Sequence, residues 1–281
     1  MSGSASRNIV ALKKMANRLR QGIVKMVAKA GSGHPGGSLS ATEFVTALYF
    51  DVLQNIDPQN PRKENRDRFV LSKGHCCPVL YAALAGRGFF DESNLAKLRE
   101  YQSILQGHPD MNKTPGVDIS TGSLGNGLSV GLGMALSARL KGLDYKVYVM
   151  LGDGELQEGM VWEAAMCAAH HKADNLIAIV DCNNLQINGT VEEIMNIEPL
   201  SDKWRAFGWK ILQVDGHDME AVLNVLDEAR CMEGPVVILG KTIKGKGVSF
   251  MENEVVWHGQ APTAEQTERA LAELADEGGT Q

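Results

Sequence analysis

Apolar residues recur along the chain with two different spacings, and the two alternate. Residues 8–30 carry apolar positions every three or four residues, which predicts a helix packed against a core. Further helices are predicted over residues 42–51, 76–86, 91–101, 128–140, 199–207, 218–230 and 263–276. Short apolar runs predict strands over residues 68–71, 147–151, 176–180, 209–214 and 236–241. Strands that alternate with helices predict an α/β fold, with a parallel sheet and helices on both faces.

Three glycine-rich segments interrupt these elements, at residues 31–38, 106–127 and 242–260. A loop as long as residues 106–127 inside a compact domain usually has a function. The chain shows no internal repeat and no linker, so we expect a single domain over residues 1–281, with a disordered tail at residues 277–281.

The middle of the chain carries a polar cluster at the end of each of two successive predicted strands. Gly152, Asp153 and Gly154 follow the first strand, and Asn183 follows the second after one helix-length segment. Ligands of open parallel sheets bind at the carboxyl ends of the strands, where Asp153 and Asn183 should lie side by side. The glycines let the backbone approach an anion, and the N–H groups at the start of the following helix attract it.

Asp153 and Asn183 offer the oxygen ligands that Mg²⁺ and Ca²⁺ prefer. The carboxylate of Asp153, the amide oxygen of Asn183 and the carbonyl of Leu185 would leave places for two diphosphate oxygens and a water in an octahedron. A glycine-flanked aspartate alone is a common turn. Its pairing with two asparagines after a matching strand predicts a metal-bridged diphosphate.

Four of the seven histidines lie in loops next to glycine or proline, namely His34, His75, His108 and His258. A single loop histidine is more often a surface residue than a catalytic one. Four in such loops indicate contacts to phosphates or hydroxyls and proton transfer near neutral pH. His217, in the sequence DGHD, is interpreted as a turn residue, and Glu158 as an acid that complements a helix dipole.

Composition narrows the classes of function. The net charge is −6 and the chain has no basic block, which argues against a nucleic-acid partner. No apolar run approaches the roughly 18 residues of a membrane helix. The first ten residues have no apolar signal core, so we expect a cytoplasmic protein. Five cysteines without zinc spacing fit reduced thiols in that compartment.

These motifs together resemble the transketolase family. The glycine-aspartate-glycine and double-asparagine pair is the family's thiamine diphosphate signature. Residues 10–262 carry further matching motifs in the same order, namely SGHPGG, LSKGH, GHPD, TGSLGNG, GDGELQEG and WHGQAP. The resemblance is to the N-terminal, diphosphate-binding half of the family, encoded as a separate subunit. Ser123 departs from the proline that many members have.

The resemblance implies a role for each matching residue. Asp153, Asn183 and the Leu185 carbonyl would hold Mg²⁺, or Ca²⁺ or Mn²⁺ in its place. The cofactor would contact His75, Gly122, Leu124, Gly152, Asp153, Gly154, Glu155, Asn183 and His258. The catalytic set would be His34, His75, His108, His258 and Glu158, in which His34 and His108 bind sugar hydroxyls and move protons. Glu158 would face the partner at an interface between the chains.

The implied activity is the transfer of a two-carbon ketol group between sugar phosphates, with thiamine diphosphate as cofactor. Family members need a glutamate from a pyrimidine-binding domain, which would come from a C-terminal subunit. The resemblance therefore implies a heterotetramer of two such chains with two partners. This chain by itself would bind Mg²⁺–thiamine diphosphate weakly and would not turn over.

Three alternatives stay open from sequence. The α subunit of a 2-oxo acid dehydrogenase shares the cofactor signature but is not expected to combine SGHPGG, LSKGH and GHPD. A fragment similar to 1-deoxyxylulose-5-phosphate synthase is a second alternative, although GDGELQEG favours transketolase. A non-catalytic, diphosphate-binding partner is the third. The sequence does not identify the sugars.

Overall fold

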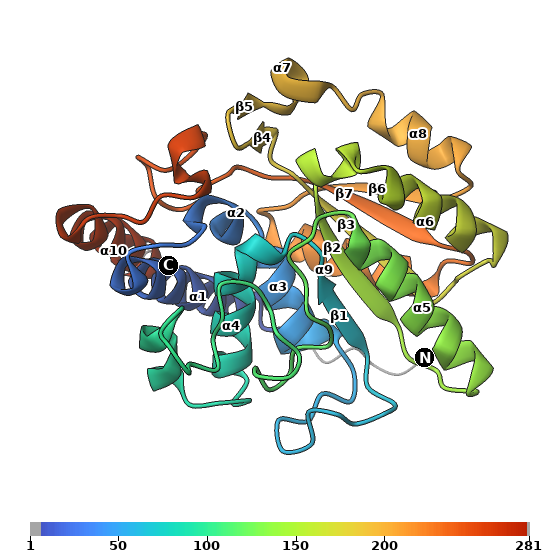
Figure 1. Ribbon diagram of the computed structural model, residues 1–281, viewed down its shortest axis with the longest axis horizontal. Coiled ribbons are helices and arrows are strands. Elements are labelled where there is room, and N and C mark those ends of the chain that lie inside the picture. The colour runs from blue at the N-terminus through green and yellow to red at the C-terminus, as the bar shows by residue number, and fades with distance from the viewer. Residues whose placement is uncertain (1–6, 280–281) are drawn as a thin grey trace.

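The central feature of the computed structural model, which describes residues 7–279, is a five-stranded parallel sheet (Figure 1). Its strands are β1 (Arg68–Leu71), β2 (Val147–Gly152), β3 (Leu176–Cys182), β6 (Lys210–Asp215) and β7 (Val236–Lys241). They lie in the order β1-β2-β3-β7-β6, and every neighbouring pair is parallel. The predicted parallel sheet is confirmed, and each strand lies within two residues of its predicted bounds.

Helices cover both faces of this sheet, as predicted (Figure 1). One face is covered by α1 (Ile9–Ala30), α3 (Thr42–Ala47), α4 (Cys77–Gly86) and α9 (Met219–Cys231), and α10 (Ala264–Gly279) packs against α1. The other face packs against α5 (Asn126–Leu140), α6 (Gly159–His170) and α8 (Leu200–Ala206). Successive side chains of a strand enter opposite clusters; Tyr148 and Met150 enter the first, Val147 and Val149 the second. Strands buried on both faces read as continuous apolar runs for this reason.

The helix predicted over residues 128–140 is α5, and it packs closely on the sheet. A Cβ added at Gly131 would lie 2.3 Å from a methyl carbon of Val149, and one at Gly127 would lie 2.2 Å from the Ser72 hydroxyl. The glycines therefore set the distance between helix and sheet. On the solvent side of the same helix, a Cβ at Gly133 would meet nothing within 4 Å.

Several local expectations were wrong. The glycine-rich segment 31–38 contains the start of a short helix, α2 (Pro35–Ser40), because a proline at the first position favours a helix start. The helix predicted over residues 91–101 is the 3-10 helix η3 (Glu92–Lys97), and Arg99 has a positive φ. The hairpin of β4 (Leu185–Gln186) and β5 (Gly189–Thr190), and α7 (Val191–Met195), were not predicted.

The C-terminal helix is longer than its sequence pattern suggests. The backbone of α10 is helical to Gly279, which includes residues 277–279 of the tail expected to be disordered. Residues 280–281 of that tail lie outside the described residues. Within residues 7–279 no helix is both long and apolar enough to span a bilayer.

Candidate active site at the carboxyl edge of the sheet

The ends of β2 and β3 bring together the two polar clusters that the sequence pairs. Gly152 lies opposite Asp181 in the parallel register, so Asp153 and Asn183 leave adjacent strands at the same edge. The Asp153 carboxylate accepts hydrogen bonds from the N–H of Gly154 at 2.8 Å and from the N–H of Asn184 at 2.5 Å. The loop after β2 and the loop after β3 are thus joined through the Asp153 carboxylate.

The environment of Asp153 fits a bound divalent cation. Its side chain is buried, and no Lys, Arg or His within residues 7–279 forms an ion pair with it. Burial, together with the nearby charge of Asp181, raises the pKa of Asp153 to about 6. A cation beside it would favour the ionised form. Asn183 and Leu185 lie close by, since the Asn183 amide oxygen accepts the Leu185 N–H at 3.1 Å.

Asp181 fixes the orientation of Asn183 from below. It is completely buried and accepts hydrogen bonds from Ser40, Lys73, Thr242 and the Asn183 side-chain amide, the last at 3.0 Å. Burial alone would raise the pKa of Asp181, but the Lys73 ammonium holds it below its ordinary value. Because the Asn183 nitrogen donates to Asp181, its oxygen is directed the other way. The Lys73–Asp181 pair was not predicted from the sequence, where its signal is two charged residues at the ends of apolar strands.

Glu155 joins the β2 end to the glycine-rich loop 121–125. Its buried carboxylate accepts hydrogen bonds from the Ser72 hydroxyl, from the Gly125 N–H at 2.9 Å and from the Gly152 N–H at 3.0 Å. Burial raises its pKa. With these bonds the side chain supports the loop from beneath.

Three of the four predicted histidines form one cluster. The ring centroids of His34, His75 and His258 lie 5.1 Å, 5.5 Å and 5.2 Å apart, for the pairs His34–His75, His34–His258 and His75–His258. Burial and neighbouring positive groups lower the pKa of His34 and His75 to about 4, and that of His258 to about 3. All three imidazoles are therefore neutral at pH 7. Nδ1 of His34 is buried and has no hydrogen-bond partner among the described residues, which is uncommon for a buried polar atom.

The fourth histidine, His108, lies at the exposed rim. Its ring packs on Gly122, where an added Cβ would lie 3.1 Å from His108 Cδ2, and where a φ of +152° favours glycine. Gly74 also packs closely on Gly122, since a Cβ added at Gly74 would lie 2.8 Å from the main-chain nitrogen of Gly122. The loops that carry His75, His108 and Gly122 are therefore stacked on one another. Leu124 is half-buried in the same loop as Gly122.

Two cations near these histidines were not singled out from sequence. The Lys244 ammonium lies 2.8 Å from the Leu185 carbonyl and 2.8 Å from His258 Nδ1, and burial lowers the pKa of Lys244. Arg99 is close enough for its charge to contribute to the low pKa of His34 and of His108. Both residues lie in loops without a phosphate-binding spacing, so no motif pointed to them.

Glu158 lies on the surface at the start of α6. It follows the 3-10 helix η4 (Gly154–Gln157), and its Cβ would be only 2.7 Å from a Cβ at Gly125. The side chain is exposed, and the same helix exposes Met160 and Met166 at 41% and 59%.

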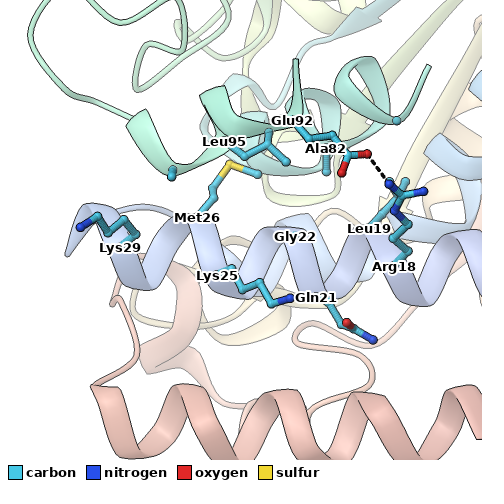
Figure 2. A pocket seen from close by; sticks show the side chains of 12 residues that line it. Arg18, Leu19, Gln21, Gly22, Lys25, Met26, Lys29, Ala82, Glu92 and Leu95 are labelled. Atoms are coloured by element: carbon cyan, nitrogen blue, oxygen red, sulfur yellow. Dashed lines mark hydrogen bonds and ion pairs between the residues drawn. The ribbon is translucent and has the colours of Figure 1, made fainter. Parts of the chain in front are cut away.

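The structure has one cavity beside the candidate site and another away from it. One of about 410 Å³ opens beside Asp153 and is also lined by Cys182, Asn184 and Glu198. Another, of about 560 Å³, lies between α1, α4 and η3 and has an apolar floor that includes Met26 and Leu95 (Figure 2). None of the predicted site residues lines this second cavity, so its size alone does not make it the active site.

The model of the family described as "Transketolase, thiamine diphosphate binding domain" matches residues 11–275. The chain belongs to this family. The resemblance seen in the sequence is thereby confirmed, and thiamine diphosphate is the cofactor of the matched domain.

Two relatives match this member of the transketolase family over nearly their whole length. One of them, an apulose-4-phosphate transketolase subunit from Phocaeicola vulgatus, is 45% identical over 94% of this chain and 94% of its own. The other, the 6-deoxy-6-sulfo-D-fructose transketolase subunit SqwG from Clostridium sp., is 45% identical over 97% of this chain and 99% of its own. These matches favour transketolase over the alternatives left open by the sequence.

Longer transketolases match over less than half of their length. The crystal structure of Campylobacter jejuni transketolase has a TM-score of 0.89 and 34% identity, and the match covers 99% of this chain but 44% of that one. Human transketolase is 40% identical over 95% of this chain and 42% of its own. The chain thus corresponds to about two fifths of these proteins.

Proposed function

We propose that this chain is the N-terminal subunit of a two-subunit transketolase, which moves a two-carbon ketol group from a ketose phosphate to an aldose phosphate. The observation that carries the proposal is the cluster of three neutral, half-buried histidines beside the Asp153–Asn183 edge. Relatives of equal length that are named as transketolase subunits support it. Within the proposal, residues 1–281 form a single diphosphate-binding domain.

The proposed cofactor site uses the oxygen atoms at the strand ends and the cations opposite them. Asp153, Asn183 and the Leu185 carbonyl would bind Mg²⁺, for which Ca²⁺ or Mn²⁺ are substitutes with the same oxygen preference. The burial of the Asp153 carboxylate, which forms no ion pair within residues 7–279, supports this assignment. The diphosphate would face the main-chain N–H groups that follow β2. It would also face the side chains of His75, His258 and Lys244. Gly122 and Leu124 would line the pocket beside the rings, and Glu155 would act by holding the loop 121–125.

The neutral imidazoles suit the proposed chemistry. Bound thiamine diphosphate supplies a carbon nucleophile that carries the two-carbon unit. A neutral imidazole both donates and accepts a hydrogen bond, so it can hold a sugar hydroxyl or relay its proton. His34 has a buried Nδ1 to which no described residue bonds, and His108 lies at the rim where a substrate would enter. His258 would contact both diphosphate and substrate.

The proposal requires a second chain. A C-terminal subunit with a pyrimidine-binding domain would supply the activating glutamate, and Glu158 on the exposed start of α6 would face it. Exposed Met160 and Met166 on the same helix support a protein contact there. The active assembly would be a heterotetramer of two chains of each kind.

Reconstitution with such a partner tests the function. The chain and its C-terminal partner are co-purified and supplied with Mg²⁺, thiamine diphosphate and an aldose phosphate acceptor. The donor panel contains xylulose 5-phosphate, fructose 6-phosphate, apulose 4-phosphate and 6-deoxy-6-sulfo-D-fructose, because relatives are named for the last two. We expect ketol transfer from at least one donor with both chains and none with this chain alone. A normal rate from this chain alone would refute the split-site proposal.

Matched variants separate an enzyme from a non-catalytic binding partner. Asp153→Ala should abolish transfer and weaken cofactor binding measured by calorimetry, because the buried metal ligand is lost. Glu228→Ala, an exposed acid on α9, serves as the control. Equal cofactor affinity in wild type and Asp153→Ala would exclude the proposed metal site. Cofactor binding without any transfer by the complex would favour a non-catalytic role.

A further inference from the structure

A hydrogen-bonded triad of Arg20, Glu43 and His217 lies outside the histidine cluster, with little of its side chains exposed. Arg20 comes from α1, Glu43 from α3 and His217 from the turn between β6 and α9. Their side chains are 7%, 8% and 13% exposed. None of the three belongs to the histidine cluster, and the interpretation of His217 as a turn residue leaves its ring without a role.

The hydrogen bonds of the triad define the state of His217. Arg20 donates to one carboxylate oxygen of Glu43 at 2.5 Å, and His217 Nδ1 lies 3.0 Å from the other. His217 Nε2 accepts the main-chain N–H of Ile243 at 2.8 Å. Since Nε2 is an acceptor, the ring proton is on Nδ1, and Nδ1 donates to Glu43. Both ring nitrogens are therefore used, one toward Glu43 and one toward the segment after β7.

That segment, residues 242–247, is held at two points by the triad. His217 binds the N–H of Ile243, and Arg20 Nε donates to the carbonyl of Lys246 at 3.1 Å. Lys244 lies between these two points. Gly245 and Gly247 have φ values of +84° and +90°, and a Cβ at Gly247 would lie 3.0 Å from Arg20 Cδ. Two such glycines give the segment little rigidity of its own, so its shape depends on its anchors. These are the two triad bonds together with main-chain bonds such as that from the Asn253 N–H to the Lys244 carbonyl at 2.9 Å.

Lys244 needs accurate placement for a physical reason. Its ammonium is buried at the end of a flexible four-carbon stem, and it reaches the Leu185 carbonyl and His258 at the same time. A shift of the main chain by about 1 Å would break one of these two contacts. The segment also donates the Gly245 N–H to the Gly36 carbonyl at 3.0 Å, two residues from His34.

We propose that Glu43, acting through Arg20 and His217, is a positioning residue that fixes residues 242–247 so that Lys244 meets the anionic end of the cofactor. The inference rests on the proposed function, because it takes the diphosphate as the ligand of Lys244. Removal of one member would leave the others as uncompensated buried groups and would free one anchor of the segment. The triad itself touches neither cofactor nor substrate.

A double-mutant cycle tests the inference in the full chain. Four proteins, each in complex with the C-terminal partner, are compared by calorimetry with Mg²⁺–thiamine diphosphate: wild type, His217→Phe, Lys244→Met and the double variant. His217→Phe should raise Kd about tenfold, or about 1.4 kcal/mol, and His217→Gln, which retains a donor and an acceptor, should restore most of the affinity. In the Lys244→Met background, His217→Phe should have little further effect. The proposal would be overturned if the factors by which the two substitutions raise Kd multiply in the double variant. An unchanged Kd in His217→Phe would also overturn it.

A cofactor-independent measurement separates this inference from the proposed function. Hydrogen–deuterium exchange should be faster across residues 242–248 in His217→Phe than in wild type, with α5 unchanged. Exchange that stays slow there would overturn the positioning role even if the cofactor binds. If the wild-type complex binds no thiamine diphosphate, the proposed function fails while exchange still reports on the triad. Should His217→Phe fail to fold, Glu43→Gln, which keeps the side-chain shape, is measured in the same two assays.

Discussion

The carboxylate of Asp153 makes the stability of the metal-free chain depend on pH in a way that can be worked out. Burial and the charge of Asp181 raise its pKa from an ordinary 3.8 to about 6. Between these values the folded chain binds more protons than the unfolded chain. Its contribution to stability is therefore complete below pH 3.8 and is lost as the pH rises through 6. A difference of about two pKa units corresponds to about 3 kcal/mol.

Asp153→Asn removes this ionisation and keeps the shape of the side chain. The new amide nitrogen would face one of the two main-chain N–H groups that the carboxylate binds, which costs about 1–3 kcal/mol at every pH. The pH-dependent part is separate from that cost. We expect the unfolding free energy of the variant, minus that of wild type, to rise by about 2–2.5 kcal/mol between about pH 4 and pH 7.

Urea unfolding in EDTA at several pH values measures this difference directly. Repeating the series with saturating Mg²⁺ and diphosphate is the control, because a cation lowers the pKa of Asp153 and should flatten the pH dependence. A difference that does not change with pH would show that Asp153 ionises in the folded chain as it does in the unfolded one. The burial argument, and with it the support for a cation site, would then be refuted.

Two further outcomes follow from packing and from the histidine cluster. Gly131→Ala should destabilise the chain by about 1–3 kcal/mol, because its Cβ would overlap Val149. Gly133→Ala, on the open side of α5, should instead stabilise the chain by about 0.5–1 kcal/mol. Urea unfolding of both variants measures these changes, and equal changes in stability for the two variants would refute the packing argument. In NMR titrations of the cofactor-free chain, the rings of His34, His75 and His258 should stay neutral down to about pH 5, because their pKa values lie at about 4, 4 and 3. Their contribution to stability is present above about pH 6.5 and is lost as the pH falls toward 4, and a titration midpoint near 6.5 would contradict their burial.

The sequence predicted most elements correctly, and it predicted that Asp153 and Asn183 meet at one edge of the sheet, because these features depend on local patterns. Runs of apolar residues mark strands that are buried on both faces, and helix-length segments between them require parallel neighbours. Successive strands joined in this way are usually adjacent, so Asp153 and Asn183 were expected at one edge, and β2 and β3 place them there. Local patterns failed at residues 91–101, where a 3-10 helix and positive φ angles replace the predicted helix.

The order of the strands was decided only by the tertiary structure. Although β6 precedes β7 in the chain, β7 pairs with β3 and β6 lies at the edge. No local pattern contains this order, because it depends on which strand is stabilised more by burial between two neighbouring strands. Its consequence is that residues 242–247, which follow β7, lie beside the end of β3. Lys244 reaches the site for this reason.

The chemical state of the site was likewise decided by packing. The sequence determined which groups are present: an oxygen-rich pair of strand ends and four loop histidines. Burial, the Lys73–Asp181 pair and the nearness of Lys244 determine that three histidines are neutral and that Asp153 carries a raised pKa. These protonation states depend on distances between residues far apart in the chain, because desolvation and charge act through space and not along the sequence.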